Sequence, residues 1–222
     1  MSVLGQALGN QKARKKNDFY PTIDPRSVPP LLAAMAAVGD GPRYAEPCAG
    51  AGDLIHLLEP HGLDCQWGLE LEPQGDLAMN RWPIGVGNAL MLSEADCDGV
   101  DCFITNPAWS RPLLHLLIRH LASLRPTWLL FDASWAYTKQ AARFSQMCTD
   151  VVAVGRLKFF PPPGRLLHLP GESAADYAAR TKKKRSKDPP DDCAWYRFDM
   201  RAVPAQTRFH FPVAREPSGG LI

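Results

Sequence analysis

Short runs of β-branched and aromatic residues alternate along the chain with stretches of helical periodicity. The segment RPLLHLLIRHLASL after Ser110 has the i, i+3, i+4 apolar spacing of a helix that packs one face on a sheet. Pro29 and Pro30 suit the first turn of a helix over LLAAMAAV, and Asp53 can cap LIHLLE. This alternation predicts an α/β protein with a mainly parallel sheet. The expected strands are 43–46, 65–71, 84–87, 100–105, 127–132, 151–160 and 194–200.

The remaining segments define the expected domain limits. A short crossover helix is expected at 74–81 and a longer helix at 134–147. The last two strands flank a Pro- and Lys-rich stretch at 161–193, which reads as a long loop insertion. Residues 1–16 and 215–222 are expected to be a flexible basic arm and a flexible tail. One domain over 17–214 follows.

Composition agrees with a globular protein of one domain. The 222 residues are 45% apolar, which is enough for a full core. No apolar run approaches the roughly 20 residues that span a bilayer, and no apolar segment follows the basic N-terminal residues. We therefore expect neither a membrane span nor a secretory signal, and a cytoplasmic location. The six cysteines are scattered without a C-x-x-C pair, which indicates neither a zinc site nor a disulfide framework.

Positive charge is concentrated in two short segments. Residues 12–16 hold four Lys/Arg and residues 180–187 hold six, with no acid in either. Without those ten charges the net charge of +2 becomes −8. Such segments can contact a polyanion, although solvated mobile segments have the same composition.

A glycine-containing loop follows the first expected strand in the sequence Glu46-Pro47-Cys48-Ala49-Gly50-Ala51-Gly52-Asp53. Small residues let the backbone approach a ligand at the carboxyl end of a parallel strand. Glu70 comes about 20 positions after the glycines, where a carboxylate can accept both hydroxyls of a ribose. Glu46 would repel a phosphate at this loop. The pattern therefore predicts a nucleoside ligand with a cationic end.

The fourth expected strand leads into Asn106-Pro107-Ala108-Trp109. This tetrapeptide resembles the Asn/Asp-Pro-Pro-aromatic catalytic motif of class I S-adenosylmethionine-dependent methyltransferases that modify exocyclic amines in DNA. The resemblance covers roughly 17–160 and is nearest to small phage and prophage-type adenine methyltransferases. It implies a Rossmann-like, seven-stranded α/β sandwich, mostly parallel, with an antiparallel last strand.

The resemblance also implies the residues of the site. S-adenosylmethionine would be held by an N-terminal motif, the glycine-containing loop, the acid after the second strand, the adenine pocket and the catalytic asparagine. These positions are Asp18, Tyr20, Pro21, Thr22, Glu46, Pro47, Cys48, Gly50, Gly52, Asp53, Glu70, Leu71, Asn88, Ala89 and Asn106. Two positions depart from the family: Ala108 replaces a proline, and Asn88 replaces the usual Asp.

The motif suits an amine whose lone pair is delocalised into an aromatic ring. The Asn106 side-chain oxygen and the Pro107 carbonyl can accept the amine hydrogens and favour a pyramidal nitrogen. Trp109 would stack on a base rotated out of the duplex. Arg111, Lys182, Lys183, Lys184, Arg185 and Lys187 are the candidate contacts to nucleic acid.

The predicted function is methyl transfer to a DNA base, with adenine N6 as the favoured target and low sequence specificity. Four alternatives stay open: cytosine N4 in DNA, an RNA base, a protein glutamine, and a cofactor-binding pseudoenzyme that binds nucleic acid. No metal is expected, because the histidines at 56, 61, 115 and 120 fit ordinary helix or loop positions. Asp53 has a second interpretation as a helix cap.

Overall fold

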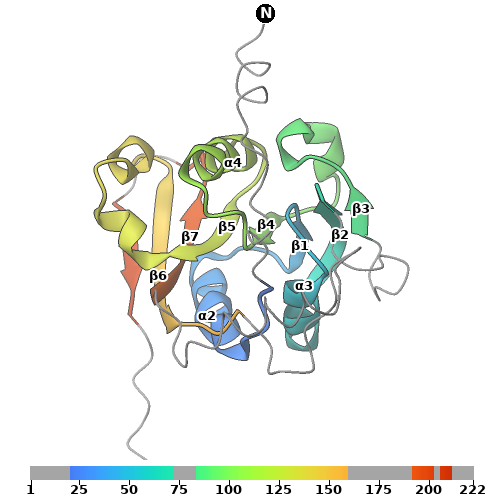
Figure 1. The fold of residues 1–222 in the computed structure, drawn as a ribbon, viewed down its shortest axis with the longest axis horizontal. Helices are drawn as coiled ribbons and strands as arrows, with labels where there is room; N and C mark the ends of the chain where they lie inside the picture. The colour runs from blue at the N-terminus through green and yellow to red at the C-terminus, as the bar shows by residue number, and fades with distance from the viewer. Residues whose placement is uncertain (1–20, 73–83, 160–191, 203–205, 212–222) are drawn as a thin grey trace, which may run out of the picture.

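An eight-stranded sheet of order β3-β2-β1-β4-β5-β7-β6-β8 forms the centre of the molecule (Figure 1). The computed structural model describes residues 21–72, 84–159, 192–202 and 206–211. The expected arm, the helix at 74–81, nearly all of the insertion and the tail lie outside these ranges. The strands are β1 (Arg43–Glu46), β2 (Asp64–Glu70), β3 (Ile84–Val86), β4 (Cys102–Thr105), β5 (Thr127–Asp132), β6 (Cys148–Arg156), β7 (Asp192–Phe198) and β8 (Arg208–His210).

Strand direction follows the predicted fold class. The pairs among β1, β2, β3, β4 and β5 are parallel, and β7 lies antiparallel between β5 and β6. The mainly parallel, Rossmann-like sheet with an antiparallel seventh strand is therefore confirmed. The largest boundary difference is in β6, which was expected at 151–160.

The expectation of seven strands was wrong, because β8 adds an eighth beside β6. Its attachment is polar. Asp150 on β6 is fully buried and accepts hydrogen bonds from Arg208 at 2.8 Å, while His210 lies 2.8 Å from the same carboxylate. Because polar contacts to one buried carboxylate hold this three-residue strand, its sequence has no hydrophobic periodicity that would predict a strand.

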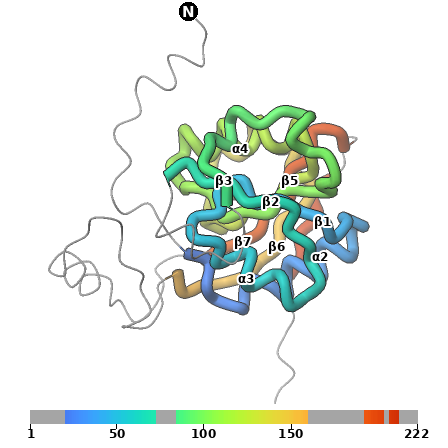
Figure 2. The backbone as a smooth tube through the Cα atoms, turned by 90° about the vertical axis from the view of Figure 1, so that its right-hand side faces the viewer, coloured from blue at the N-terminus to red at the C-terminus, as the bar shows by residue number. Residues whose placement is uncertain are grey.

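Helices cover both faces of the sheet (Figures 1 and 2). The helices α2 (Val28–Val38) and α3 (Asp53–Leu58) lie on one face, and α4 (Arg111–Leu124) lies on the other. The strands β4 and β5 are buried along nearly their whole length, as expected for parallel strands between two helical layers. Short 3₁₀ helices complete the described chain: η1 (Pro25–Ser27), η2 (Glu59–His61), η4 (Ala89–Met91), η5 (Glu94–Cys97), η6 (Ala133–Tyr137) and η7 (Ala141–Phe144).

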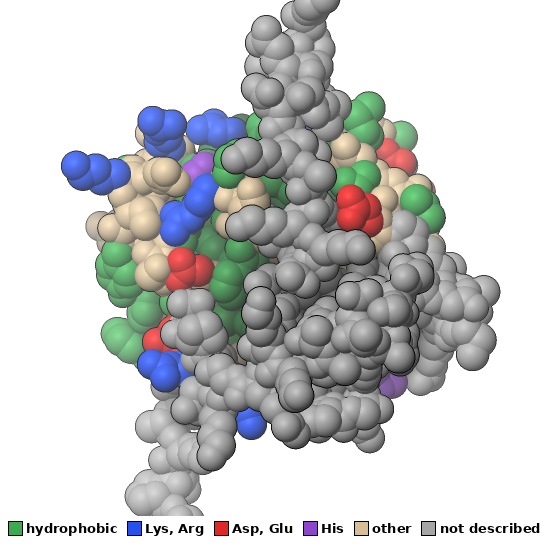
Figure 3. Space-filling model, viewed as in Figure 1, with side chains coloured by type: hydrophobic (Ala, Val, Ile, Leu, Met, Phe, Trp, Pro, Cys, Tyr) green, Lys and Arg blue, Asp and Glu red, His purple; other side chains and the backbone are tan. Residues whose placement is uncertain are grey.

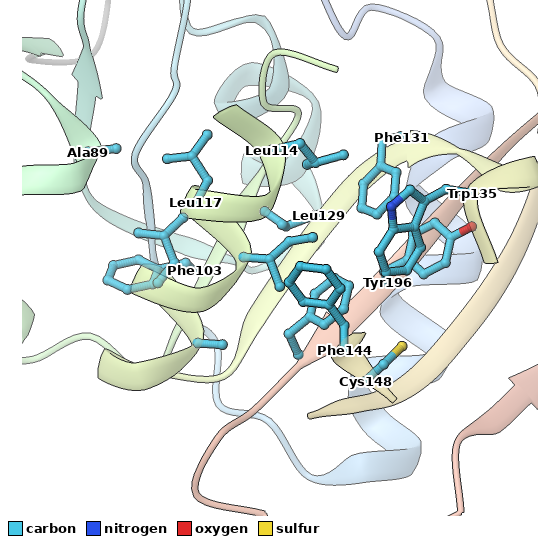
Figure 4. Close-up of a cluster of buried hydrophobic side chains, with 14 of the residues drawn as sticks. Ala89, Phe103, Leu114, Leu117, Leu129, Phe131, Trp135, Phe144, Cys148 and Tyr196 are labelled. Carbon is cyan, nitrogen blue, oxygen red and sulfur yellow. The ribbon is translucent and has the colours of Figure 1, made fainter. Parts of the chain in front are cut away.

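The core beneath α4 is rich in aromatic rings (Figure 4). Leu114 and Leu117 of α4 pack on the same cluster as Phe103 and Leu129 of the sheet. Phe131 stacks on Tyr196 of β7 with ring centroids 4.2 Å apart, and Trp135 meets Phe131 edge-on at 5.3 Å. The aromatic contacts join β5, β7 and the segment after β5 into one rigid layer.

The prediction of a helix at 134–147 was wrong, because this segment forms η6 and η7 with a break between them. Thr138 makes the break. Its Oγ1 donates to the Trp135 carbonyl at 2.8 Å, and its backbone N–H donates to the same carbonyl at 3.0 Å. A hydroxyl that competes for a helix carbonyl favours a turn over further α-helix. The apolar spacing that indicated a helix instead places Trp135 and Phe144 in the core.

One buried ion pair ties the end of α2 to the centre of the sheet. Asp40 accepts hydrogen bonds from Nε and a terminal nitrogen of Arg197, both at 2.8 Å, and from the Trp128 indole at 2.7 Å. The side chains of Arg197 and Asp40 are 10% and 7% exposed. Burial opposes the charge on Arg197, but the hydrogen bonds and charge of Asp40 outweigh it and raise the pKa of the guanidinium.

Arg197→Met should destabilise the protein strongly, because it leaves the Asp40 carboxylate buried without its partner. We expect a loss of about 3–5 kcal/mol in urea unfolding. Arg156→Met is the control, since Arg156 is 58% exposed and 3.8 Å from Asp192; it should lose about 1 kcal/mol or less. Equal losses in the two variants would contradict a structural role for the buried pair.

Candidate nucleoside-binding and catalytic site

Three strand ends bring the predicted site residues to one edge of the sheet. The strands β2, β1 and β4 are adjacent and parallel, so their carboxyl ends meet there. Glu46 ends β1, Glu70 ends β2, and Asn106 follows β4 directly. This edge is where open α/β sheets bind ligands.

The glycine-containing loop is bound tightly to the end of β2. The backbone N–H of Ala49 donates to the Leu69 carbonyl at 2.8 Å, and that of Gly50 donates to the Glu70 carboxylate at 2.9 Å. Gly50 and Gly52 have φ angles of 56° and 80°, a region that glycine enters without strain. The loop therefore needs glycine at both positions.

Gly52 is the N-cap of α3, so the expectation that Asp53 caps this helix was wrong. Asp53 is instead the first helical residue, and the left-handed backbone of Gly52 makes the turn into the helix. A carboxylate in the first turn still favours the helix dipole.

Glu70 has a structural role that the sequence did not reveal. One carboxylate oxygen accepts from Gly50, and the other accepts from the backbone N–H of Glu72 at 3.0 Å. Each carboxylate oxygen can accept two hydrogen bonds. The same side chain can thus position the loop and accept ribose hydroxyls.

Glu46 is a buried carboxyl group, 2% exposed, at the centre of the edge. Among the described residues its Oε2 has no hydrogen-bond partner, while the Ile55 N–H donates to the same carboxyl group. Burial first, and then the charges of Asp53 and Glu70, raise its pKa well above the ordinary value. Burial also raises the pKa of Asp53. Three crowded carboxyl groups make this edge a favourable place for a cation.

The Asn106 side chain is fixed on both sides. Its Nδ2 donates to the Thr22 hydroxyl at 3.0 Å, and its Oδ1 accepts from the Trp109 indole N–H at 2.9 Å. The Thr105 hydroxyl donates to the Cys48 carbonyl at 3.4 Å, which joins the same turn to the glycine-containing loop. Three predicted motifs that are far apart in the sequence therefore meet at Asn106.

The residues after Pro107 help to hold the turn at Asn106. Ala108 is buried at 6% exposure. The Trp109 ring meets Phe159 edge-on, with centroids 5.6 Å apart. The indole bond to Asn106 and this ring contact restrain the turn.

The adenine-pocket positions lie on the β2 and β3 side of Glu70. Asn88 caps η4, because its Oδ1 accepts from the Leu90 N–H at 3.0 Å, and Ala89 is buried. Leu71 follows Glu70 and is 43% exposed, and Val86, which pairs with Glu70, is 66% exposed. Exposed apolar side chains beside a carboxylate that can bind a ribose are suited to contact the face of a purine ring.

The other predicted residues are only partly within the described ranges. Pro21, Thr22 and Pro47 are buried beside the site. Outside the described residues lie the two N-terminal positions, Asp18 and Tyr20, and the five basic positions of the insertion, Lys182, Lys183, Lys184, Arg185 and Lys187. Arg111 forms an ion pair with Asp132 at 3.5 Å. The contact of Phe159 with Trp109 was missed, because nothing in the sequence indicates a partner 50 positions away.

Within the described ranges, no group of three or more His, Cys, Asp or Glu could hold a metal ion. No helix there is long and apolar enough to cross a membrane. All six cysteines are free thiols.

No protein-family model matches the sequence, and no curated protein matches it at a significant level. Solved structures do resemble the fold. A putative class I S-adenosylmethionine-dependent methyltransferase from Listeria monocytogenes is 9% identical, with a TM-score of 0.47 over 94% of this chain and 70% of its own. A modification subunit of a putative type I restriction enzyme from Vibrio vulnificus is 13% identical, with a TM-score of 0.47 over 90% of this chain and 48% of its own.

A putative RNA methyltransferase from Pyrococcus horikoshii is 17% identical, with a TM-score of 0.39 over 76% of this chain and 80% of its own. With TM-scores below 0.5, these matches assign neither a ligand nor a substrate to this chain.

Glu46→Gln should stabilise the ligand-free protein at neutral pH. Above about pH 4.5 the unfolded chain releases the Glu46 proton while the folded protein keeps it, so this residue lowers stability as the pH rises toward its folded pKa. The gain should therefore grow as the pH rises above about 5, by about 1.4 kcal/mol for each unit by which the pKa is raised. Urea unfolding over this pH range measures it.

Asp101→Asn is the control of opposite sign. Hydrogen bonds from Arg43 lower the pKa of Asp101, so this variant should lose stability at neutral pH. A Glu46→Gln variant that is less stable than the wild type at every pH would show that Glu46 is ionised and partnered in the free protein.

Proposed function

We propose that this protein is an S-adenosylmethionine-dependent methyltransferase that modifies an exocyclic amine of a nucleic-acid base, with adenine N6 in DNA as the first candidate. The observation that carries the proposal is the Asn106 amide, held between Thr22 and Trp109 at the edge where Glu46 and Glu70 converge. The Asn106 side-chain oxygen is a hydrogen-bond acceptor in a fixed position, next to a nucleoside site that favours a cation. This arrangement suits the alkylation of an amine.

The carboxyl groups fit the proposed cofactor. S-adenosylmethionine carries a ribose, an adenine and an amino acid end, and when bound it supplies an electrophilic methyl group on a positively charged sulfur. Glu70 would accept hydrogen bonds from the ribose hydroxyls. The buried Oε2 of Glu46, which has no hydrogen-bond partner among the described residues, would stabilise the positively charged part of the cofactor. Leu71 and Val86 would contact the base, with Asn88 at its edge.

Asn106 and Pro107 would act on the target amine. The Asn106 Oδ1 and the Pro107 carbonyl accept its hydrogens, which directs the nitrogen lone pair away from the ring. Because Thr22 and Trp109 already hold the amide, Asn106 needs little reorganisation as positive charge develops on the amine. The amine then loses its proton to solvent, so a strong base is not required.

Two features favour a nucleic-acid substrate over a protein glutamine: the positive charge of the two basic segments and the aromatic surface of Trp109. The two basic segments suit a phosphate backbone, and the Trp109 ring offers a stacking surface for a flipped base. Methylation of cytosine N4 or of an RNA base would use the same acceptors. These targets are separated by the substrate test below.

Glu70→Ala should weaken S-adenosylmethionine binding about ten- to hundredfold, because hydrogen bonds to a charged acceptor are each worth about 1.5–3 kcal/mol. Titration calorimetry measures the affinity. The control is Asp98→Ala, an exposed carboxylate before β4 at the opposite edge, which should bind as the wild type does. Unchanged affinity in a folded Glu70→Ala protein would remove this carboxylate from the cofactor site.

Asn106→Ala should abolish methyl transfer while S-adenosylmethionine affinity changes little. Its acceptor matters chiefly in the transition state, so we expect kcat to fall about a hundredfold or more. Trp109→Phe keeps an aromatic ring but removes the indole N–H, and it should lower kcat by less. The measurement is transfer of a labelled methyl group to unmethylated DNA, RNA and protein, followed by chromatography of the nucleosides and amino acids.

Label in N6-methyladenine from DNA is the expected result. Label in another base, in RNA or in glutamine would change the substrate but keep the reaction. Near-normal turnover by Asn106→Ala would overturn the catalytic role, and cofactor binding without transfer to any substrate would indicate a pseudoenzyme.

A further inference from the structure

The chain between the Asn106 turn and β6 is unusually poor in acidic residues. From Trp109 to Thr149 it has a single acid, Asp132, and five Lys/Arg. These are Arg111, Arg119, Arg125, Lys139 and Arg143. The stretch lies outside both basic segments that the sequence analysis singled out.

Two arginines on α4 share one helix face with a histidine. Arg111, His115 and Arg119 follow each other at intervals of four, which places them on one face of the helix. Arg119 lies over the Phe144 ring, 5.0 Å from its centroid, and the His115 ring is 4.8 Å from Phe144. This face of α4 therefore packs on η7.

The same packing brings Arg143 of η7 to this face. Burial first, and then the charges of Arg111, Arg119 and Arg143, lower the pKa of His115. His115 accepts a hydrogen bond from the Trp135 indole at 3.2 Å, which holds the ring between α4 and η6. The three arginines thus converge around one imidazole. We call these three arginines and Lys139, which lies between η6 and η7, the basic ridge.

Most of the ridge is open to solvent. Arg119, Lys139 and Arg143 are exposed, and among the described residues none of the three forms an ion pair. Asp132 is the one acid of this stretch, and it pairs with Arg111. Figure 3 shows Lys and Arg side chains gathered with a histidine on this side of the molecule, over α4 and the segment after β5. Positive charge therefore exceeds negative charge along the ridge.

The ridge begins beside the proposed catalytic turn. Arg111 comes two residues after Trp109, and its partner Asp132 ends β5 at the edge of the sheet that holds Glu46 and Asn106. At the rise of an α-helix, Arg111 and Arg119 are about 12 Å apart along the axis of α4, a length over which one DNA strand carries roughly three to four phosphates.

We propose that the basic ridge binds the phosphate backbone of DNA beside the target base. Arginine suits this role because its planar guanidinium can donate two parallel hydrogen bonds to a phosphate. Contacts to phosphate oxygens carry no sequence information, so the contribution of the ridge is independent of sequence. The inference rests on the proposed function, since it takes nucleic acid as the substrate.

The test removes two ridge charges and compares the result with two charges removed elsewhere. Arg119→Gln with Arg143→Gln is the test protein. Arg43→Gln with Arg201→Gln is the control, because both of these arginines are about half exposed and lie at the opposite edge, at the start of β1 and after the end of β7. Binding of a fluorescent DNA duplex of mixed sequence is measured by anisotropy over a salt series, without cofactor.

The ridge variant should bind DNA more weakly at each salt concentration, and the slope of log K against log salt should fall by about 2. The control should keep the wild-type slope. With methyl transfer as the readout, the ridge variant should have a raised KM for DNA and an unchanged kcat. Because Arg119 contacts the Phe144 ring, Lys139→Gln with Arg143→Gln is a second test that leaves this contact in place.

Equal slopes for the wild type and both ridge variants would overturn the proposal, as would an equal fall in slope in the control. Loss of polyglutamate binding without loss of DNA binding would assign the ridge to an acidic protein. Single-stranded DNA and RNA of the same sequence show which backbone form binds. Failure of S-adenosylmethionine to bind would overturn the proposed function and leave the slope measurement valid.

Discussion

The crowding of carboxyl groups around the Gly50 to Gly52 turn is the constraint on which the site depends. Glu46 is buried because β1 lies between β2 and β4 and ends beneath the loop. Glu70 cannot move away, since it holds the Gly50 N–H. The charges of Asp53 and Glu70 thus raise the cost of ionising Glu46. Such an arrangement costs stability and is typical of a site that binds an ion of opposite charge.

The Asn106 turn extends this constraint to the chemistry. Thr22 comes from the segment before η1, Cys48 from the loop after β1, and Trp109 from the turn itself, and hydrogen bonds join all three to β4 or its end. The position of the amide is therefore set by a tertiary contact to Thr22 together with the local hydrogen bond from Trp109.

Much of the fold and of the site could be predicted from the sequence. The strands β1 and β5 and the helix α4 follow the expected ranges, because their hydrophobic patterns match their surroundings on the sheet. Gly50 and Glu70 lie together as expected, since a loop and an acid about 20 residues later fall at the ends of two adjacent parallel strands. Local patterns suffice where burial or strand adjacency decides the structure.

The rest depends on contacts that the sequence does not encode locally. The Thr138 hydroxyl breaks the expected helix by competing for one carbonyl. Asp150 attaches β8 through polar bonds over 58 and 60 positions. The basic ridge needs α4 and η7 to pack together before Arg119 and Arg143 become neighbours of His115.

The most direct test of the account is the proton balance of cofactor binding, measured by calorimetry in buffers of different ionisation enthalpy. Burial and the charges of Asp53 and Glu70 raise the pKa of Glu46, and a cation beside it favours the ionised form, so S-adenosylmethionine should bind with release of a proton. S-adenosylhomocysteine lacks the sulfonium charge and should release fewer protons, and Glu46→Gln should abolish the difference. Binding of both ligands with the same proton balance, in the wild type and in the variant, would contradict the account.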